Sequence, residues 1–147
     1  MKPLEGRVAV VTGASRGAGR GIALVLGDAG ATVYVTGRSV RDKETSDLPG
    51  TTLDDTVELM AARGGVGIPV RTDHTKDDEI RSLFERIERE QGKLDLLVNN
   101  AWGGYEDMGD TFGAPFWEEP MARFDRMFTA GVRSHLVTTR MALPLMM

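Results

Sequence analysis

The chain has 147 residues, of which 41% are hydrophobic and 27% are charged, and this balance is typical of one globular domain with its own core. The net charge of −4 at pH 7 argues against nucleic acid as a partner, because nucleic-acid-binding proteins present basic surfaces. The sequence has no cysteine, which excludes disulfides and cysteine–metal sites. It has no start typical of a signal peptide and no apolar run near the ~20 residues of a membrane helix, so we expect a cytoplasmic protein with no membrane partner.

Short apolar runs that favour β-strands alternate with longer runs of helical periodicity along the chain. The predicted strands cover residues 8–12, 32–36, 66–72 and 94–99. The predicted helices cover residues 17–30, 51–64, 75–92 and 119–143. This alternation predicts an α/β fold with a Rossmann-type, doubly wound parallel sheet. Right-handed crossovers then give the strand order 3-2-1-4, with helices on both faces and residues 1–147 in a single domain.

Several local features sharpen the helix predictions. Thr52 can cap the second helix, and Thr75 is expected to cap the third. One buried stripe of the third helix is predicted by residues at i, i+3, i+4 and i+7, namely Ile80, Leu83, Phe84 and Ile87. In the last helix, one face is predicted to carry Phe124, Met127, Phe128, Val132 and Leu136. Gly131 lies in the middle of that helix, where it is unfavourable and predicts a local kink.

The glycine-rich stretch between the first strand and the first helix is the most informative part of the chain. It runs Thr-Gly-Ala-Ser-Arg-Gly-Ala-Gly from Thr12 to Gly19. Closely spaced glycines permit a tight turn, and the N–H groups of the helix that follows can face an anion. In this context the stretch predicts a site for a dinucleotide pyrophosphate, and the alternative is an ordinary glycine-rich turn. The predicted cofactor-binding residues of this stretch are Gly13, Ser15, Arg16, Gly17, Ala18 and Gly19.

The glycine spacing Gly-x-x-x-Gly-x-Gly, with Thr12 before it, resembles that of the short-chain dehydrogenase/reductase family. A second family element follows the fourth predicted strand as Asn99-Asn100-Ala101, although Trp102 replaces the glycine that the family usually has next. The resemblance covers essentially the whole chain, and finer details are similar to the branch around dehydrogenase/reductase SDR family member 1. It implies an oxidoreductase that transfers hydride between a nicotinamide cofactor and a small-molecule carbonyl or alcohol substrate.

The resemblance also implies roles for four residues outside the glycine loop. Asn100 and Ala101 would lie beside the cofactor ribose, Asp73 would accept a hydrogen bond from the adenine amino group, and His74 would lie alongside through its backbone. By its residue type alone, Asp73 is as well interpreted as a turn residue before Thr75. No metal site is predicted, because no cluster of metal ligands accompanies His74.

The end of the second strand bears on the choice of cofactor. An NAD-selective site has an acid there for the ribose 2′-hydroxyl, whereas this chain has Gly37 followed by Arg38. A guanidinium can bind a 2′-phosphate, and Arg16 can approach the same phosphate from the other side. We therefore expect NADP(H) to be preferred over NAD(H), as in members of the family with this pair of basic positions. The alternative for Arg38 is a solvated surface residue.

The residues of the family's chemical step are missing. It uses a Tyr-x-x-x-Lys pair and a serine, but Tyr34 and Tyr105 are followed four residues later by Arg38 and Gly109. No catalytic residue is therefore assigned, and the chain is expected to be the cofactor-binding half of a longer enzyme and inactive alone. The alternative is a non-catalytic dinucleotide-binding module or pseudoenzyme.

Three further expectations concern partners and other sites. A P-loop hydrolase is excluded, because the one Gly-Lys pair, Gly92-Lys93, is followed by Leu94. The run from Trp102 to Tyr105 is either the floor of a substrate pocket or an ordinary loop. By resemblance, the helix at residues 119–143 is expected to join two copies of the full-length protein in a homo-oligomer. Gly131 stands where many family members have an asparagine of the proton relay.

Overall fold

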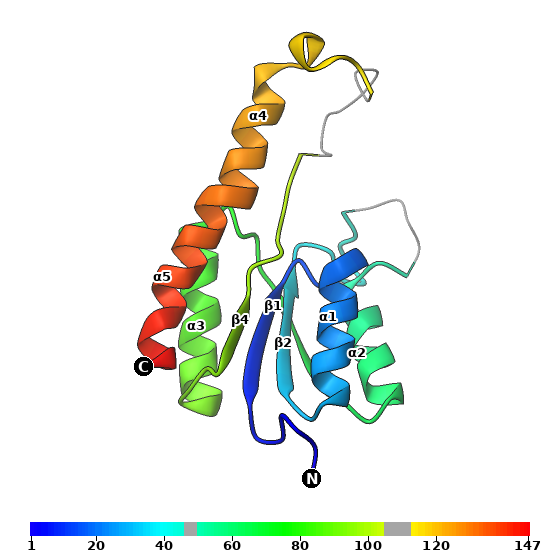
Figure 1. The fold of residues 1–147 in the computed structure, drawn as a ribbon, viewed down its shortest axis with the longest axis vertical. Helices are drawn as coiled ribbons and strands as arrows, with labels where there is room; N and C mark the ends of the chain where they lie inside the picture. The colour runs from blue at the N-terminus through cyan, green and yellow to red at the C-terminus, as the bar shows by residue number, and fades with distance from the viewer. Residues whose placement is uncertain (46–49, 105–112) are drawn as a thin grey trace.

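The computed structural model describes residues 1–45, 50–104 and 113–147, and Tyr105 lies outside these ranges. Its sheet has four parallel strands in the order β3-β2-β1-β4. Their bounds are β1 Val8–Thr12, β2 Thr32–Gly37, β3 Val66–Arg71 and β4 Leu96–Val98. This is the predicted doubly wound topology, and it brings the carboxyl ends of β1 and β4 side by side (Figure 1).

Helices cover both faces of the sheet (Figure 1). The described helices are α1 Gly17–Asp28, α2 Leu53–Ala62, α3 Asp77–Gln91, the short α4 Met121–Met127 and α5 Ser134–Met146. The hydrophobic core has two clusters, one on each face of the sheet. One cluster packs against α1 and α2, and the other packs against α3 and α5. Successive residues of β1 supply both clusters, since Val8 and Val10 pack towards α3 whereas Ala9 and Val11 pack towards α1.

The ends of α2 and α3 test the predicted caps. Thr52 caps α2 in a capping box with Asp55, which confirms that prediction. Gly92 ends α3 in the left-handed conformation, at the last residue of the predicted helix. The prediction that Thr75 caps α3 is wrong, because α3 begins at Asp77 and Lys76 occupies the cap position. The Thr75 amide and hydroxyl both donate to Asp73 Oδ1, at 3.0 and 2.7 Å, and this turn holds Thr75 away from the helix end.

Strand β4 is shorter than predicted, with Leu96–Val98 in place of residues 94–99. Its flanking residues bond to other parts of the chain. The Leu94 amide donates to the Leu145 carbonyl at 2.9 Å, and the Asn100 amide donates to Thr12 Oγ1 at 2.9 Å. The periodicity of the sequence does not distinguish the three residues that pair in the sheet from flanking residues that bond elsewhere.

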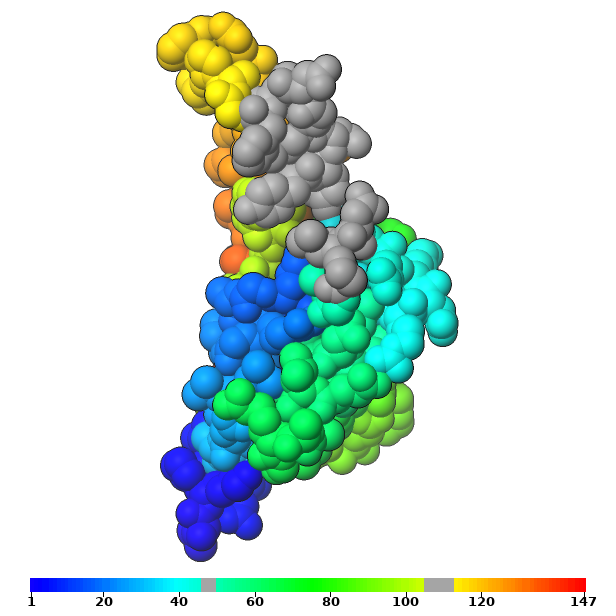
Figure 2. Space-filling model, turned by 90° about the vertical axis from the view of Figure 1, so that its right-hand side faces the viewer, coloured from blue at the N-terminus to red at the C-terminus, as the bar shows by residue number. Residues whose placement is uncertain are grey.

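The last helix runs from Met121 to Met146 and contains a π-helical segment, Phe128–Arg133, between α4 and α5. Gly131 lies in this segment, so the irregularity expected there takes the form of a π-helix. The α4 end rises beyond the strands (Figure 1), and the 3-10 helix Phe116–Glu118 before it lies far from the N-terminus (Figure 2). Within the described residues, no helix is long and apolar enough to cross a membrane.

Candidate cofactor-binding site

The glycine loop turns from β1 into α1 through two residues in the left-handed conformation, Gly13 at φ +66° and Gly17 at φ +57°. Side chains with a Cβ atom are strained there, so the turn requires glycine. No acidic side chain lies in the first turn of α1, and no side chain caps its N-terminus. The N–H groups of this turn are therefore available to an anion, which the helix dipole also favours.

Asn100 joins the end of β4 to the glycine loop through hydrogen bonds. Its side-chain amide donates to the Thr12 and Gly13 carbonyls at 2.9 and 3.0 Å. The Thr12 hydroxyl accepts from the amides of Asn100 and Ala101 at 2.9 and 2.8 Å. These bonds join the two motifs into one rigid unit at the switch point of the sheet.

The packing of the glycine loop against the end of β4 also requires glycine at Gly19. A Cβ atom at Gly19 would lie 2.3 Å from the Gly13 carbonyl oxygen and 2.4 Å from Asn100 Nδ2. A Cβ atom at Gly13 would lie 2.9 Å from the Ala101 Cα atom. Because neither residue has a Cβ atom, the glycine loop and the start of α1 can pack directly against the end of β4.

Asn99 has a different role from its neighbour. Its Nδ2 atom donates to Thr139 Oγ1 of α5 at 2.9 Å and so ties the end of β4 to that helix. Adjacent residues at a strand end point in opposite directions, so Asn100 faces the glycine loop and Asn99 faces the helix. His135 is half-buried, and its Nε2 atom donates to the Ala101 carbonyl at 2.7 Å.

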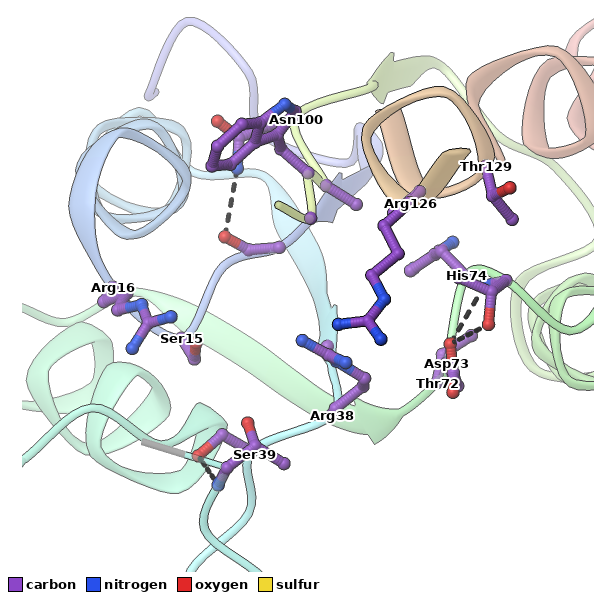
Figure 3. A pocket seen from close by; sticks show the side chains of 18 of the residues that line it. Ser15, Arg16, Arg38, Ser39, Thr72, Asp73, His74, Asn100, Arg126 and Thr129 are labelled. Carbon is purple, nitrogen blue, oxygen red and sulfur yellow. Dashed lines mark hydrogen bonds between the residues drawn. The ribbon is translucent and has the colours of Figure 1, made fainter. Parts of the chain in front are cut away.

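A cavity of about 610 Å³ opens at the carboxyl ends of the strands (Figure 3). The predicted site residues that line it are Gly13, Ser15, Arg16, Arg38, Asp73, His74, Asn100 and Ala101. The other three predicted residues, Gly17, Ala18 and Gly19, are not among its lining residues. The cavity thus joins the glycine loop, the end of β2 and the end of β4.

Three guanidinium groups lie around this cavity, from Arg16, Arg38 and Arg126. Arg38 and Arg126 point towards each other across it (Figure 3). Arg126 comes from α4, and the sequence analysis did not identify it. Only the three-dimensional structure identifies Arg126, because the local sequence pattern does not show which turn of the last helix lies next to the end of β2.

Asp73 both forms a turn and lines the cavity. Its Oδ1 atom accepts the two Thr75 bonds, and its amide donates to Glu79 Oε2 at 2.7 Å. Burial opposes ionisation, but the Thr75 hydrogen bonds and the charge of Arg38 outweigh it and hold the pKa of the Asp73 carboxyl below its usual value. Asp73 is therefore an anion at the edge of the cavity, and its role as a turn residue is confirmed.

The His74 side chain is 6% exposed and connects β2 to α5. Its Nε2 atom lies 2.7 Å from Thr36 Oγ1, and its Nδ1 atom lies 3.4 Å from Thr138 Oγ1. Burial lowers the pKa of His74 to about 4, so the ring is neutral at pH 7 and its two hydroxyl partners hold it in place. Within the described ranges, no group of three or more His, Asp or Glu residues is arranged to hold a metal ion.

Trp102 lines the cavity beside Ala101, with 43% of its surface exposed. Two glycines make room for the indole. A Cβ atom at Gly131 would lie 3.0 Å from Trp102 Cδ1, and one at Gly104 would lie 3.1 Å from Trp102 Cζ2. The tryptophan that replaces the family glycine is therefore matched by a glycine in the π-helical segment opposite it.

Residues 7–147 match the family model described as short chain dehydrogenase. The chain is 45% identical over 138 residues to Dehydrogenase/reductase SDR family member 1 of Homo sapiens, covering 90% of this chain and 40% of that protein. It is 32% identical over 141 residues to 7alpha-hydroxysteroid dehydrogenase of Escherichia coli K12, covering 96% of this chain and 48% of that protein.

Solved structures agree with these relatives. A metagenomic short-chain oxidoreductase in complex with NADP superposes with a TM-score of 0.80 at 32% identity, over 99% of this chain and 58% of that chain. A 7 alpha-hydroxysteroid dehydrogenase complexed with NADH and 7-oxo glycochenodeoxycholic acid gives a TM-score of 0.75 at 31% identity, over 97% of this chain and 49% of that chain. This chain spans less than half the length of both curated relatives. By its sequence, its fold and its two interlocked motifs, it belongs to the short-chain dehydrogenase/reductase family.

Proposed function

We propose that this chain forms the cofactor-binding half of an oxidoreductase that transfers hydride between NADP(H) and a carbonyl or alcohol substrate. The observation that carries the proposal is that the glycine loop and Arg38 open onto one cavity, while Gly37 occupies the place of the acid typical of NAD sites. The nicotinamide ring, when bound, supplies the hydride chemistry. The residues of this chain bind and orient the dinucleotide.

The two ends of the cavity suit the two ends of such a cofactor. The N–H groups at the start of α1 favour the pyrophosphate, and Gly13 and Gly19 allow the close packing that holds the glycine loop against the end of β4. Arg38 and Arg126 favour a second phosphate at the adenosine end, since guanidinium groups bind phosphate in a bidentate way. One solved relative is in complex with NADP and another with NADH, so the shared fold does not set the preference between the two cofactors. We propose that the residues at the end of β2 set it in this chain.

Neither tyrosine is followed by lysine four residues later, so we expect no hydride transfer from these 147 residues alone. Tyr34 is fully buried in the core, and its hydroxyl donates to Glu90 Oε2 at 2.7 Å. Burial raises the pKa of the Tyr34 hydroxyl, and Tyr34 does not line the cavity, so it cannot reach a bound substrate there. The alternative function, a dinucleotide-binding module without catalysis, shares the same cavity and differs only in this chemical step.

We further propose that the last helix joins two copies of the full-length protein. Its exposed apolar side chains include Phe124, Phe128, Val132 and Leu136, with 47%, 50%, 58% and 71% of their surfaces exposed. The rings of Phe124 and Phe128 lie 4.4 Å apart between centroids and form a contiguous apolar surface. Such a surface is unfavourable in water and favours a protein partner.

Calorimetric titration with NADP+ and NAD+ tests the proposed preference. Arg38→Ala is expected to weaken NADP+ binding by about 1–3 kcal/mol and to leave NAD+ nearly unchanged, because the 2′-phosphate loses a charge-assisted contact. Arg41→Ala is the matched control, since Arg41 pairs with Glu58 at 2.6 Å and does not line the cavity. Equal or tighter NAD+ binding by the unmutated chain would contradict the proposal.

A further inference from the structure

Arg20 lies behind the glycine loop, on the side away from the cavity. It follows Gly19 in α1 and does not line the cavity. Its Nη2 atom donates to the carbonyls of Ser15 and Gly50 at 2.5 and 2.6 Å, and its Nε atom donates to Thr56 Oγ1 at 3.0 Å. One side chain thus connects the loop, the segment before α2 and α2 itself.

The Thr56 hydroxyl extends this connection to a second carbonyl of the loop. It is fully buried and donates to the Ala14 carbonyl at 2.9 Å while it accepts from Arg20. The carbonyl oxygens of Ala14 and Ser15 are therefore both held from the α2 side.

The geometry of the peptide bond decides what this does to the opposite side of the loop. In a trans peptide unit, the C=O and the N–H of the next residue point in opposite directions. Holding the Ala14 and Ser15 carbonyls towards α2 directs the N–H groups of Ser15 and Arg16 away from α2. Ser15 and Arg16 line the cavity (Figure 3), where an anion meets N–H groups and not carbonyl oxygens.

We propose that Arg20 is a positioning residue for the cofactor pyrophosphate. It fixes the glycine loop in the orientation that presents N–H groups to the phosphates, without touching the cofactor itself. The inference rests on the proposed dinucleotide function. If the guanidinium is lost, the Ser15–Arg16 peptide unit is free to rotate and to turn a carbonyl oxygen towards the phosphates.

The adenosine end of the cavity has further bonds that do not involve Arg20. The amide of Leu53 donates to the Ser39 carbonyl at 2.9 Å, and Thr52 and Asp55 form the capping box of α2. These bonds keep the start of α2 next to Arg38 and remain in an Arg20 variant. We therefore expect loss of Arg20 to affect the pyrophosphate end and to spare the 2′-phosphate end.

Two ligands separate these ends in a binding experiment. NADP+ carries the pyrophosphate and the 2′-phosphate, whereas adenosine 2′-monophosphate carries only the latter. Arg20→Gln is expected to weaken NADP+ binding at least tenfold and to change adenosine 2′-monophosphate binding less than twofold. The free energy of unfolding in urea is measured in parallel, because a general loss of folded protein lowers the apparent affinity for both ligands equally.

Arg63→Gln is the matched control. Arg63 also joins α2 to α1, through Nε bonds of 2.9 and 3.1 Å to the Asp28 carboxylate, but at the end of the helices far from the glycine loop. It is expected to change neither affinity. Should Arg20→Gln fail to fold, Thr56→Val removes the second carbonyl contact with an isosteric side chain and is expected to weaken NADP+ selectively by several-fold.

Unchanged NADP+ binding by Arg20→Gln would overturn the inference, and so would an equal loss for both ligands. Failure of the proposed function looks different, because it appears in the unmutated chain as a lack of preference for NADP+ over NAD+.

Discussion

Gly19→Ala is predicted to destabilise the chain and to disrupt the cofactor site, although alanine is the better helix former. The new Cβ atom would lie 2.3 Å from the Gly13 carbonyl oxygen and 2.4 Å from Asn100 Nδ2. The first of these is a backbone atom, so a side-chain rotation cannot relieve the contact. Either α1 moves away from β1 or the Asn100 bonds break.

The magnitude follows from these two costs. Overpacking of a tight contact costs about 1–3 kcal/mol. Weakening of the two Asn100 bonds, to the Thr12 and Gly13 carbonyls, adds roughly 0.5–1.5 kcal/mol each. The helix propensity of alanine returns up to about 1 kcal/mol. We therefore expect the free energy of unfolding to fall by about 1–6 kcal/mol, a large part of the ~5–15 kcal/mol of an ordinary domain.

Gly21→Ala is the control for this prediction. Gly21 lies two residues further along the same helix, and its new Cβ atom would meet no atom within 4 Å. Only the propensity term remains, so Gly21→Ala is expected to raise the free energy of unfolding by up to about 1 kcal/mol. The opposite signs of the two variants separate the close contact from the general effect of adding a methyl group.

Urea denaturation followed by far-ultraviolet circular dichroism gives both free energies, and an NADP+ titration of the folded variants gives the effect on the site. A Gly19→Ala variant within about 0.5 kcal/mol of the parent would refute the close approach of loop and strand end, since a backbone clash of this size costs more than that. A destabilised Gly21→Ala variant would refute the assignment of open space beside it.

Two further predictions concern the sheet edge and the tryptophan. Asp95→Asn is expected to lower the free energy of unfolding at pH 7 by about 1–3 kcal/mol, because Asp95 accepts from Arg7 at 2.6 Å and from the Val8 amide at 2.9 Å. The side-chain bond from Arg7 and the backbone bond from Val8 hold its pKa at about 2, so urea denaturation should find the difference constant above about pH 5 and shrinking as the pH falls towards 2. Gly131→Asn is expected to displace Trp102 and to shift its fluorescence emission in a Trp117→Phe background, where Trp102 is the remaining tryptophan. Val132→Asn, at a neighbour that is 58% exposed, is expected to leave the emission unchanged, and equal spectra for the two variants would contradict this packing.

Local patterns were enough to predict the elements and their order. All five residues of β1 are buried, as their continuous apolar run predicts for a strand covered on both faces. The stripe of Ile80, Leu83, Phe84 and Ile87 is likewise buried. These features depend on neighbours within a few residues, and right-handed crossovers then leave little freedom in how the strands are arranged.

The details that sequence reasoning missed depend on register or on distant contacts. The register that pairs Val11 with Val98 brings Asn100 next to the Thr12 carbonyl and turns Asn99 towards α5. Thr75 has the residue type of a cap, but Asp73 competes for its amide and hydroxyl. Arg126 reaches the cavity only because the last helix extends past the carboxyl ends of the strands.

The site residues divide into those that face the cavity and those that shape it. Ser15, Arg16 and Arg38 present their backbone or side chains to the cavity. Gly19 and the Asn100 amide hold the loop against the end of β4. A lower cofactor affinity after substitution of a motif residue therefore does not identify that residue as a contact. Two ligands that share one end of the cofactor show which end a substitution affects, because a change at the pyrophosphate end weakens only the ligand that carries the pyrophosphate. The structure then separates contact from shaping, since Arg20 and Gly19 do not line the cavity whereas Ser15 and Arg16 do.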